Sequence, residues 1–194
     1  YEKRNIDKGG NVNIVGVIPA RYNSTRFPGK PLADICGKPM IWWVYQQVKK
    51  VKELTEVFVA TDDNRIKKEC EKYNIKVLMT RSNHPDHIAR IQEVSDIINA
   101  DMYVCINGDE PLIDDNAISK VIKKALTLKK PFFIGAFRYL TEPAETIDSA
   151  NIKIVTNKEN RAVYVSRTPI PFPKGTLIFK YKKYVGIECF TKEA

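Results

Sequence analysis

Three cationic side chains, those of Arg21, Arg26 and Lys30, stand within the short segment PARYNSTRFPGKP. The segment also holds two hydroxyl side chains and a glycine, and it follows the apolar run at 13–18 (NIVGVI), which is typical of a strand buried on both faces. Several cationic donors in fixed geometry suit a triphosphate. Since open α/β sheets bind ligands outside the carboxyl ends of their strands, the segment predicts a phosphate-binding loop rather than an ordinary surface loop rich in turn formers. It matches neither GxxxxGK[ST] nor GxGxxG.

A second polar segment, NGDEP, follows another apolar run at 102–106 (MYVCI). Acidic side chains at the carboxyl end of a strand suit Mg²⁺, which binds through carboxylate and phosphate oxygens. Taken alone the segment is also compatible with a simple Gly-Asp turn. Together with the basic loop, it predicts a site for phosphate and metal.

Two further segments carry charged side chains after predicted strands. The segment 80–90 (TRSNHPDHIAR) opens a predicted helix, so its backbone N–H groups can meet a ligand, and Arg90 falls in the first helical turn. We assign His84 and His87 structural roles. In 166–171 (SRTPIP), Arg167 could pair with a substrate carboxylate, or it is one more surface arginine before a proline turn.

Alternating strands and helices must position these segments. The predicted strands are 13–18, 56–60, 75–79 and 102–106, and the helices between and after them are 40–51, 64–73, 88–98 and 116–128. This order predicts an α/β fold of three layers, with helices on both faces of a mixed, mostly parallel sheet. After about residue 130, the strands 132–140, 152–156, 162–166 and 184–190 add to the sheet edge or form a small second sheet.

Composition excludes several classes of protein. The chain has 194 residues, of which 43% are hydrophobic, so intrinsic disorder is excluded. No apolar run is long enough to span a membrane, and the polar first ten residues, YEKRNIDKGG, lead us to expect no secretory signal. Four scattered cysteines predict reduced, buried thiols in a cytoplasmic protein, without a disulfide framework or a structural metal.

The formal net charge of +9 has two interpretations. One is a basic face that binds nucleic acid, and the other is a solvated lysine-rich surface with a local anion site. The lysine pairs are dispersed and lack interleaved aromatic residues, which favours the second interpretation and predicts no nucleic-acid partner.

The chain starts at Tyr1 rather than Met and ends on a segment that reads as running into a helix, so we expect a fragment whose C-terminus is missing. We predict a single domain over residues 12–194, preceded by a polar segment at 1–11.

Five motifs in this order resemble the CMP-Kdo synthetase family, the 3-deoxy-manno-octulosonate cytidylyltransferases. That family has the pattern IPARxxSTRxPGKPL, ATDD, MTxxxHxSGTxR, GDEPL and SRxPIP. The corresponding segments here are 18–32 (IPARYNSTRFPGKPL), 60–63 (ATDD), 79–90 (MTRSNHPDHIAR), 108–112 (GDEPL) and 166–171 (SRTPIP). The resemblance covers nearly the whole chain from Val12, and the first motif is long and specific.

The resemblance implies a Rossmann-like nucleotidyltransferase fold and an enzyme that couples CTP with an acidic sugar, Kdo or a similar one, to give CMP-sugar and pyrophosphate. It implies Mg²⁺ as the cofactor, a cytoplasmic homodimer for the full-length protein, and a place in lipopolysaccharide biosynthesis. By position, the nucleotide would be held by Ala20, Arg21, Ser24, Arg26, Lys30, Thr80, Arg81 and Arg90. Arg21, Lys30 and the metal ligand Asp109 would be catalytic, and the sugar would contact Arg167, Tyr184 and Glu188.

Two motifs depart from the family pattern. SGTxR reads DHIAR, so only Arg90 remains, and the family's HxGxY near the sugar reads YVGIE, which ends in Glu188. A carboxylate beside a sugar acid is repulsive unless it is paired. The departures leave two alternatives open: a nucleotidyltransferase for a different acceptor sugar, and a nucleotide-binding relative without turnover.

Overall fold

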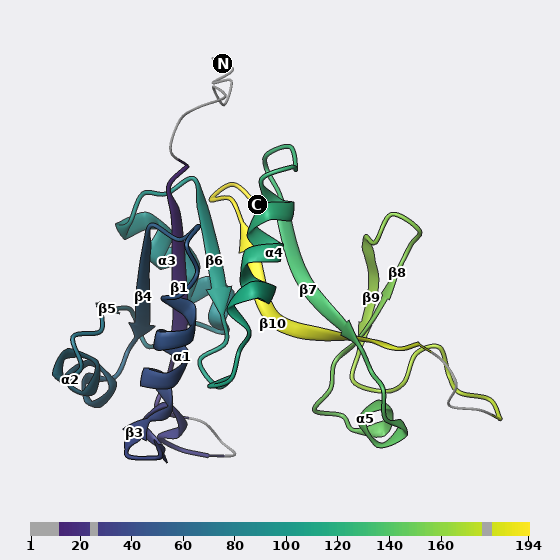
Figure 1. Cartoon of the computed structure of the whole chain (residues 1–194), viewed down its shortest axis with the longest axis horizontal. Helices are drawn as coiled ribbons and strands as arrows, with labels where there is room; N and C mark the ends of the chain where they lie inside the picture. Colours follow the sequence, from purple (N-terminus) through teal and green to yellow (C-terminus); the bar gives the residue numbers. More distant parts are fainter. Residues whose placement is uncertain (1–11, 24–26, 176–179) are drawn as a thin grey trace. The chain divides into compact units, whose positions relative to one another are not determined.

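The computed structural model describes residues 12–23, 27–175 and 180–194 (Figure 1). These residues form two compact units. One comprises the chain up to residue 134 together with 188–194, and the other comprises 135–187. Whether the two units act as the single domain predicted over residues 12–194 stays a prediction.

A mostly parallel sheet forms the centre of the first unit, in the order β5-β4-β1-β6-β10. Its parallel strands are β1 (Ile14–Ala20), β4 (Glu56–Thr61), β5 (Val77–Met79) and β6 (Met102–Ile106). The strand β10 (Lys182–Phe190) contributes its last residues to this unit. These strands are apolar runs because helices cover both faces of the sheet.

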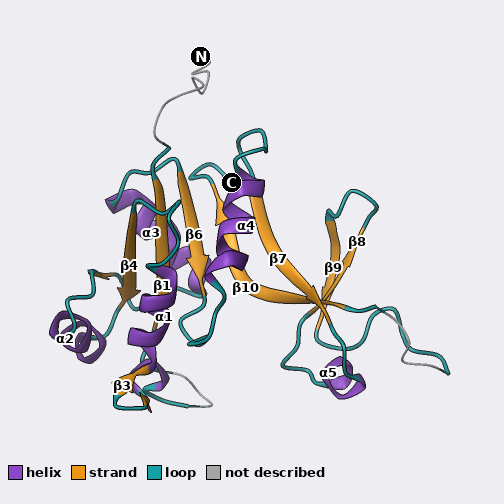
Figure 2. Ribbon diagram, in the orientation of Figure 1, coloured by secondary structure: helices purple, strands orange, loops and turns teal. Residues whose placement is uncertain are grey.

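The helices of the first unit are α1 (Met40–Val48), α2 (Asn64–Lys72), α3 (His87–Ile97) and α4 (Asp115–Ala125). In Figure 2, α1 and α4 lie in front of the sheet and α3 lies behind it. Three of them begin at an aspartate whose side chain accepts a backbone N–H of the first turn, namely Asp63, Asp86 and Asp114. The predicted order of strands and helices, and with it the three-layer α/β fold, is confirmed.

Alternation along β1 divides the core between the two faces. Val15 and Val17 pack in one apolar cluster with Ile91 and Val94 of α3. Gly16 points to the other face, where a Cβ would lie 3.5 Å from the side chain of Val48 in α1. Cys105 belongs to the α3 cluster and is buried. Cys105 therefore lies on the face of the sheet that α3 covers.

Two short elements after the first polar loop were not predicted. A 3₁₀ turn at Lys30–Leu32 is followed by a hairpin of β2 (Asp34–Ile35) and β3 (Lys38–Pro39). Its two central residues have positive φ angles, 52° at Cys36 and 79° at Gly37, as a two-residue hairpin turn requires. The prediction that all four thiols are buried is wrong for Cys36, which this turn exposes, and right for the other three.

The second unit is built from antiparallel strands. The strand β8 (Lys153–Thr156) pairs with β9 (Ala162–Ser166) and with the first residues of β10, and most of β7 (Phe133–Tyr139) belongs to this unit and pairs with β10. The prediction of strands in this half of the chain is confirmed, while the one-turn helix α5 (Pro143–Ile147) was not foreseen. No helix among the described residues is both long and apolar enough to cross a membrane.

Candidate active site

The carboxyl ends of the parallel strands define one edge of the first unit. The register pairs Ala20 at the end of β1 with Thr61 at the end of β4, and Thr61 with Met79 at the end of β5. The loops that follow these strands and β6 therefore emerge at the same edge. Among the described residues that were predicted to bind nucleotide or metal, Ala20 ends β1. The others belong to these loops or to the first turns of the elements that follow them, namely Arg21, Lys30, Thr80, Arg81, Arg90 and Asp109.

Lys30 and Asp109 join the basic loop to the acidic loop. The Nζ atom of Lys30 lies 2.7 Å from Oδ2 of Asp109, and the two side chains are 27% and 46% exposed. The contact is a charge-assisted hydrogen bond between residues that are far apart in sequence. The structure thus brings together a predicted phosphate-binding cation and the predicted metal ligand.

Gly108 explains how Asp109 reaches this position. A Cβ at Gly108 would lie 2.9 Å from the carbonyl oxygen of Pro19, closer than real Cβ atoms approach backbone. Only glycine therefore lets the loop after β6 lie directly against the end of β1. The glycine of the GDEPL motif has a packing reason that the sequence alone did not give.

The stem of the basic loop is closed by Tyr22 and Gly29. The backbone N–H of Gly29 donates to the carbonyl oxygen of Tyr22 at 2.8 Å, and Gly29 has a φ of 71°. The guanidinium carbon of Arg65, in the first turn of α2, lies 3.3 Å from the centroid of the Tyr22 ring. This cation–π contact, together with the bond from Arg65 to Asp63, ties the loop stem to α2.

Among the remaining predicted residues of the basic loop, Ala20 is buried at the end of β1 and Arg21 is exposed directly after it. Arg21 is near enough to His87 for its positive charge to lower the pKa of that imidazole, although this is a minor cause there. Ser24 and Arg26 lie outside the described residues.

Thr80 and Arg90 are both predicted to hold the nucleotide, and their side chains contact each other next to the loop after β5. Arg90 is only 4% exposed, and its guanidinium donates to Oγ1 of Thr80 and lies 3.3 Å from Oδ1 of Asp62. The backbone N–H of Thr80 in turn donates to the carbonyl oxygen of Thr61 at 2.8 Å. Arg90 is therefore a buried, paired cation that holds two loops together.

Arg81 and His84 share one carboxylate, that of Glu93 in α3. The backbone N–H of Arg81 donates to Oε2 of Glu93 at 3.0 Å, and Nε2 of His84 contacts the same oxygen. Burial alone would raise the pKa of Glu93, but the hydrogen bonds from His84 and Arg81 outweigh it and lower that pKa. The Arg81 side chain is 71% exposed, and its Nε atom lies 3.5 Å from Oε1 of Glu93.

His87 and Glu188 form a second imidazole–carboxylate pair. Nε2 of His87 lies 3.1 Å from Oε2 of Glu188, and Glu188 is 6% exposed. The hydrogen bond with Glu188 raises the pKa of His87 against the opposing effect of burial. The Sγ atom of Cys105 lies within 4.8 Å of both ligating atoms of this pair. From the sequence, Glu188 is predicted to contact the sugar and His87 to have a structural role, and the sequence does not predict that their side chains contact each other.

The other two predicted sugar ligands belong to the second unit. Nη1 of Arg167 donates to the carbonyl oxygen of Ser149 at 3.0 Å, and Tyr184 is half-buried on β10. Sequence reasoning missed Lys153, which is fully buried and whose Nζ donates to the carbonyl oxygens of Asp148 at 2.7 Å and Arg167 at 3.0 Å. Burial lowers the pKa of Lys153. The signal that could have found it is a lysine between two isoleucines, Ile152 and Ile154, at the start of an apolar strand.

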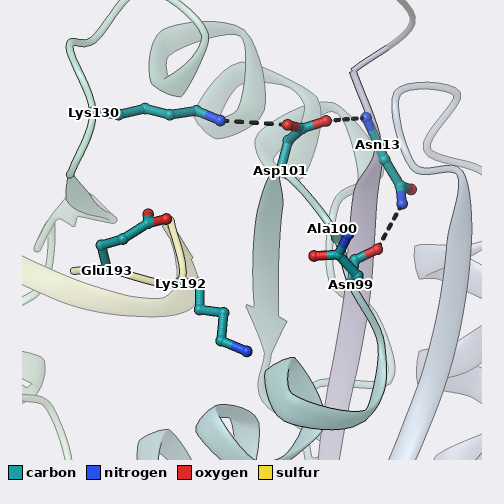
Figure 3. Close-up of a pocket in the computed structure, with 7 residues that line it drawn as sticks. All are labelled: Asn13, Asn99, Ala100, Asp101, Lys130, Lys192 and Glu193. Atoms are coloured by element: carbon teal, nitrogen blue, oxygen red, sulfur yellow. Dashed lines mark hydrogen bonds and ion pairs between the residues drawn. The ribbon is translucent and has the colours of Figure 1, made fainter. Parts of the chain in front are cut away.

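A polar cavity of about 300 Å³ lies at the opposite edge of the sheet, beside the starts of β1 and β6 (Figure 3). Two of its charged side chains interact with groups of the protein. The carboxylate of Asp101 accepts from the backbone N–H of Asn13 at 2.9 Å and lies 3.6 Å from Nζ of Lys130. Because none of the predicted site residues lines this cavity, we do not assign it to the candidate active site.

Comparisons with known proteins identify the relatives of this chain. The 3-deoxy-manno-octulosonate cytidylyltransferase of Escherichia coli is 37% identical over 91% of this chain and 72% of its own length. The 8-amino-3,8-dideoxy-manno-octulosonate cytidylyltransferase of Shewanella baltica (strain OS195) is 38% identical over 94% and 76%. A solved structure of CMP:2-keto-3-deoxy-manno-octonic acid synthetase complexed with CTP superposes with a TM-score of 0.86, at 36% identity, over 93% of this chain and 75% of that one.

The sequence profile described as "Cytidylyltransferase" matches residues 15–194, which covers both units from the first strand onward. Together with the identity to the two relatives, this match decides the family. The chain belongs to the 3-deoxy-manno-octulosonate cytidylyltransferase family, whose members are nucleotidyltransferases.

Proposed function

We propose that this chain transfers a cytidylyl group from CTP to an acidic octulosonate sugar, either Kdo or its 8-amino derivative, and releases pyrophosphate. Two kinds of finding support the substrates. The two curated relatives carry these sugars in their names, and the similar solved structure is a complex with CTP.

The contact between Lys30 and Asp109 is the observation that carries the proposal. A transferase for a nucleoside triphosphate must neutralise several phosphate charges and hold the reacting phosphorus in line with its nucleophile. The 2.7 Å contact brings a phosphate-binding cation and a carboxylate to one point at the strand ends, and the exposed Arg21 lies on the same basic loop as Lys30. A solvated lysine-rich surface requires no such convergence.

The residues around Asp109 fit a magnesium ion. Mg²⁺ is usually bound through one or two carboxylates, with phosphate oxygens and water completing its shell. Asp109 offers one half-exposed carboxylate at the site edge, and Glu110 follows it. Asp109 would hold the ion, which when bound supplies charge neutralisation on the phosphates and lowers the pKa of a coordinated hydroxyl.

The side chains themselves would act mainly by positioning and charge. Lys30 and Arg21 would bind triphosphate oxygens and stabilise the negative charge that develops on the departing pyrophosphate. The anomeric hydroxyl of the sugar attacks the α-phosphorus, the bond to the β-phosphate oxygen breaks, and the hydroxyl proton passes to solvent. Thr80 and Arg90, held together below the site, would fix the loop that meets the nucleoside.

A different acceptor sugar is the second candidate function, and one contact favours it. His87 and Glu188 pair at 3.1 Å, and both stand where the chain departs from the family pattern. A partly buried imidazole–carboxylate pair in place of the family's glycine and tyrosine changes the shape and charge near the predicted sugar end. Arg167, which belongs to the second unit, stays the predicted partner of the sugar carboxylate.

Pyrophosphate release tests both candidates in one experiment. The protein is incubated with Mg²⁺, each of the four ribonucleoside triphosphates, and either Kdo, 8-amino-3,8-dideoxy-manno-octulosonate or a neutral hexose. Release with CTP and one of the octulosonates is expected. Release only with another sugar favours the changed acceptor, and CTP binding without release contradicts both. Size-exclusion chromatography of the same sample tests the expected homodimer, and cytoplasmic location stays a prediction.

A further inference from the structure

Three side chains with metal-ligating atoms meet in the first unit: His87 at the start of α3, Cys105 on β6 and Glu188 on β10. The ligating nitrogen, sulfur and oxygen all lie within 4.8 Å of one another, and the nitrogen and oxygen are 3.1 Å apart. Around a tetrahedral zinc ion, ligand atoms are separated by roughly 3.3–3.6 Å, given bond lengths of about 2.0–2.3 Å. Small side-chain adjustments would bring the three groups to that spacing.

Packing alone does not account for this cluster. Glu188 stands in the apolar run GIECF and is 6% exposed, where a carboxylate is costly unless it is paired. His87 takes the place of the glycine in the family's SGTxR motif, and Glu188 that of the tyrosine in HxGxY. The two departures are 101 residues apart in sequence, and yet their side chains bind each other. Cys105 adds a thiol to the same pair.

The donor set indicates which ions would bind. Thiolate and imidazole ligands select zinc-class transition metals, whereas Mg²⁺ and Ca²⁺ prefer oxygen ligands alone. Three protein ligands leave one coordination position open, as in zinc sites that also hold a water. The side chain of His87 is 41% exposed, while Glu188 and Cys105 are buried, so an ion would be reached from the imidazole side. The positive charge of Arg21 also acts on His87, so the imidazole lies within the electrostatic influence of the basic loop.

We propose that Nε2 of His87, Sγ of Cys105 and a carboxylate oxygen of Glu188 form a three-ligand site for a zinc-class metal ion, additional to the Mg²⁺ ligand Asp109. On binding, the thiol of Cys105 loses its proton to solvent and a metal–sulfur bond forms. His87 gives up its Nε2 hydrogen bond to Glu188, releases the Nε2 proton to solvent and keeps the proton on Nδ1. No group is oxidised or reduced, and affinity rises with pH because the thiol must ionise.

Cobalt titration tests the site directly, since Co²⁺ occupies zinc sites and reports thiolate ligation by its near-ultraviolet charge-transfer absorption. The whole chain is used with Cys36→Ser, which removes the exposed thiol. We expect one equivalent of Co²⁺ to produce the thiolate band together with intense visible bands of tetrahedral cobalt, and Zn²⁺ to displace it. The band should be absent from the additional variant Cys105→Ser.

Cys105→Ser replaces a buried residue and could lose the band because it misfolds, so two further variants, His87→Gln and Glu188→Gln, serve as independent tests. Both leave the thiol in place, and His87 is half-exposed. Each should weaken Co²⁺ binding by more than about 10-fold, since loss of even an outer partner of a metal ligand costs that much. Zn²⁺ should raise the midpoint of thermal unfolding in the Cys36→Ser protein and not in its His87→Gln derivative. No thiolate band, or a band that persists unchanged in both glutamine variants, overturns the site. These readouts do not use turnover, so they stand apart from the proposed function.

Discussion

The ammonium group of Lys30 lies 2.7 Å from the carboxylate of Asp109, which joins the loop after the first strand of the sheet to the loop after β6. Each group limits the position of the other, so the phosphate-binding cation and the metal-binding carboxylate are oriented as a pair. Both side chains are partly exposed, which leaves room for a triphosphate to insert its own oxygens. Three predictions concern this pair and the glycine that supports it.

Asp109→Asn should abolish most turnover and leave CTP binding largely intact. The amide keeps the size of the side chain but removes the charge that would hold Mg²⁺, and loss of one such electrostatic group costs about 10²–10³ in kcat. Pyrophosphate release and CTP titration calorimetry measure the two effects. Asp115→Asn, in the first turn of α4, is the matched control. Unchanged turnover in Asp109→Asn would remove this residue from the metal site.

Lys30→Met should weaken CTP binding by roughly 10- to 100-fold, which corresponds to the loss of a charged hydrogen bond of about 1.5–3 kcal/mol. Methionine keeps the length and apolar stem of lysine, so the 3₁₀ turn at Lys30–Leu32 should remain. Lys49→Met, at the C-cap of α1, removes a charge away from the loop. Equal dissociation constants for the two variants would contradict the assignment of Lys30 to the triphosphate.

Gly108→Ala should impair both stability and turnover. Its Cβ would lie 2.9 Å from the carbonyl oxygen of Pro19, and backbone cannot yield as a flexible side chain does. Overpacking of this kind costs about 1–3 kcal/mol in the free energy of unfolding, and it would displace Asp109. Gly135→Ala is the control, since its nearest neighbours would be 3.7 Å away. Urea unfolding and pyrophosphate release measure the two effects, and a Gly108→Ala protein that matches this control in both would show that the loop needs no glycine there.

Sequence reasoning reached the parallel strands and the flanking helices because each rests on local chemistry. Apolar runs such as 102–106 predict buried strands, and Asp63 and Asp114 stand directly before their helices. The joining of Lys30 to Asp109 was also foreseeable, since both follow parallel strands whose carboxyl ends share an edge.

The remaining contacts depend on strand order and on depth in the core. His87 and Glu188 meet because β10 lies beside β6, and no local pattern places the last strand of the chain there. Lys153 was overlooked because lysine is rarely buried, and it is satisfied here by carbonyl oxygens from Asp148 and Arg167. Cys36 was expected to be buried, but its turn requires two residues of positive φ at an exposed position.

Arg90→Met should destabilise the protein by about 3–5 kcal/mol, as expected when one partner of a buried ion pair is removed. The guanidinium is 4% exposed, and without it the carboxylate of Asp62 loses its cation and Thr80 its donor. Urea unfolding followed by tryptophan fluorescence measures the loss. Arg65→Met breaks an ion pair whose arginine side chain is 57% exposed and should cost about 1 kcal/mol or less. Equal losses of stability in the two variants would mean that the contacts of Arg90 with Asp62 and Thr80 do not stabilise the fold more than an exposed ion pair does.

The pair Arg138 and Glu145 in the second unit predicts a pH dependence of stability. The hydrogen bond from Arg138 lowers the pKa of Glu145 from 4.5 to about 2, and the backbone N–H of Thr141 adds to the effect. Because the folded-state pKa lies below the unfolded one, the charged form favours folding. The contribution of Glu145 is therefore fully present above pH 4.5 and is lost as the pH falls towards 2.

Glu145→Gln should accordingly reduce the free energy of unfolding at about pH 6, and the difference from the unsubstituted chain should shrink between pH 4.5 and 2. Urea unfolding followed by circular dichroism across this range is the measurement. The exposed Glu159, on the turn between β8 and β9, supplies the control Glu159→Gln, for which we expect no comparable pH-dependent difference. A Glu145→Gln difference that stays constant with pH would mean that the charge of Glu145 does not stabilise the fold, and that α5 is held to β7 by hydrogen bonding and packing alone.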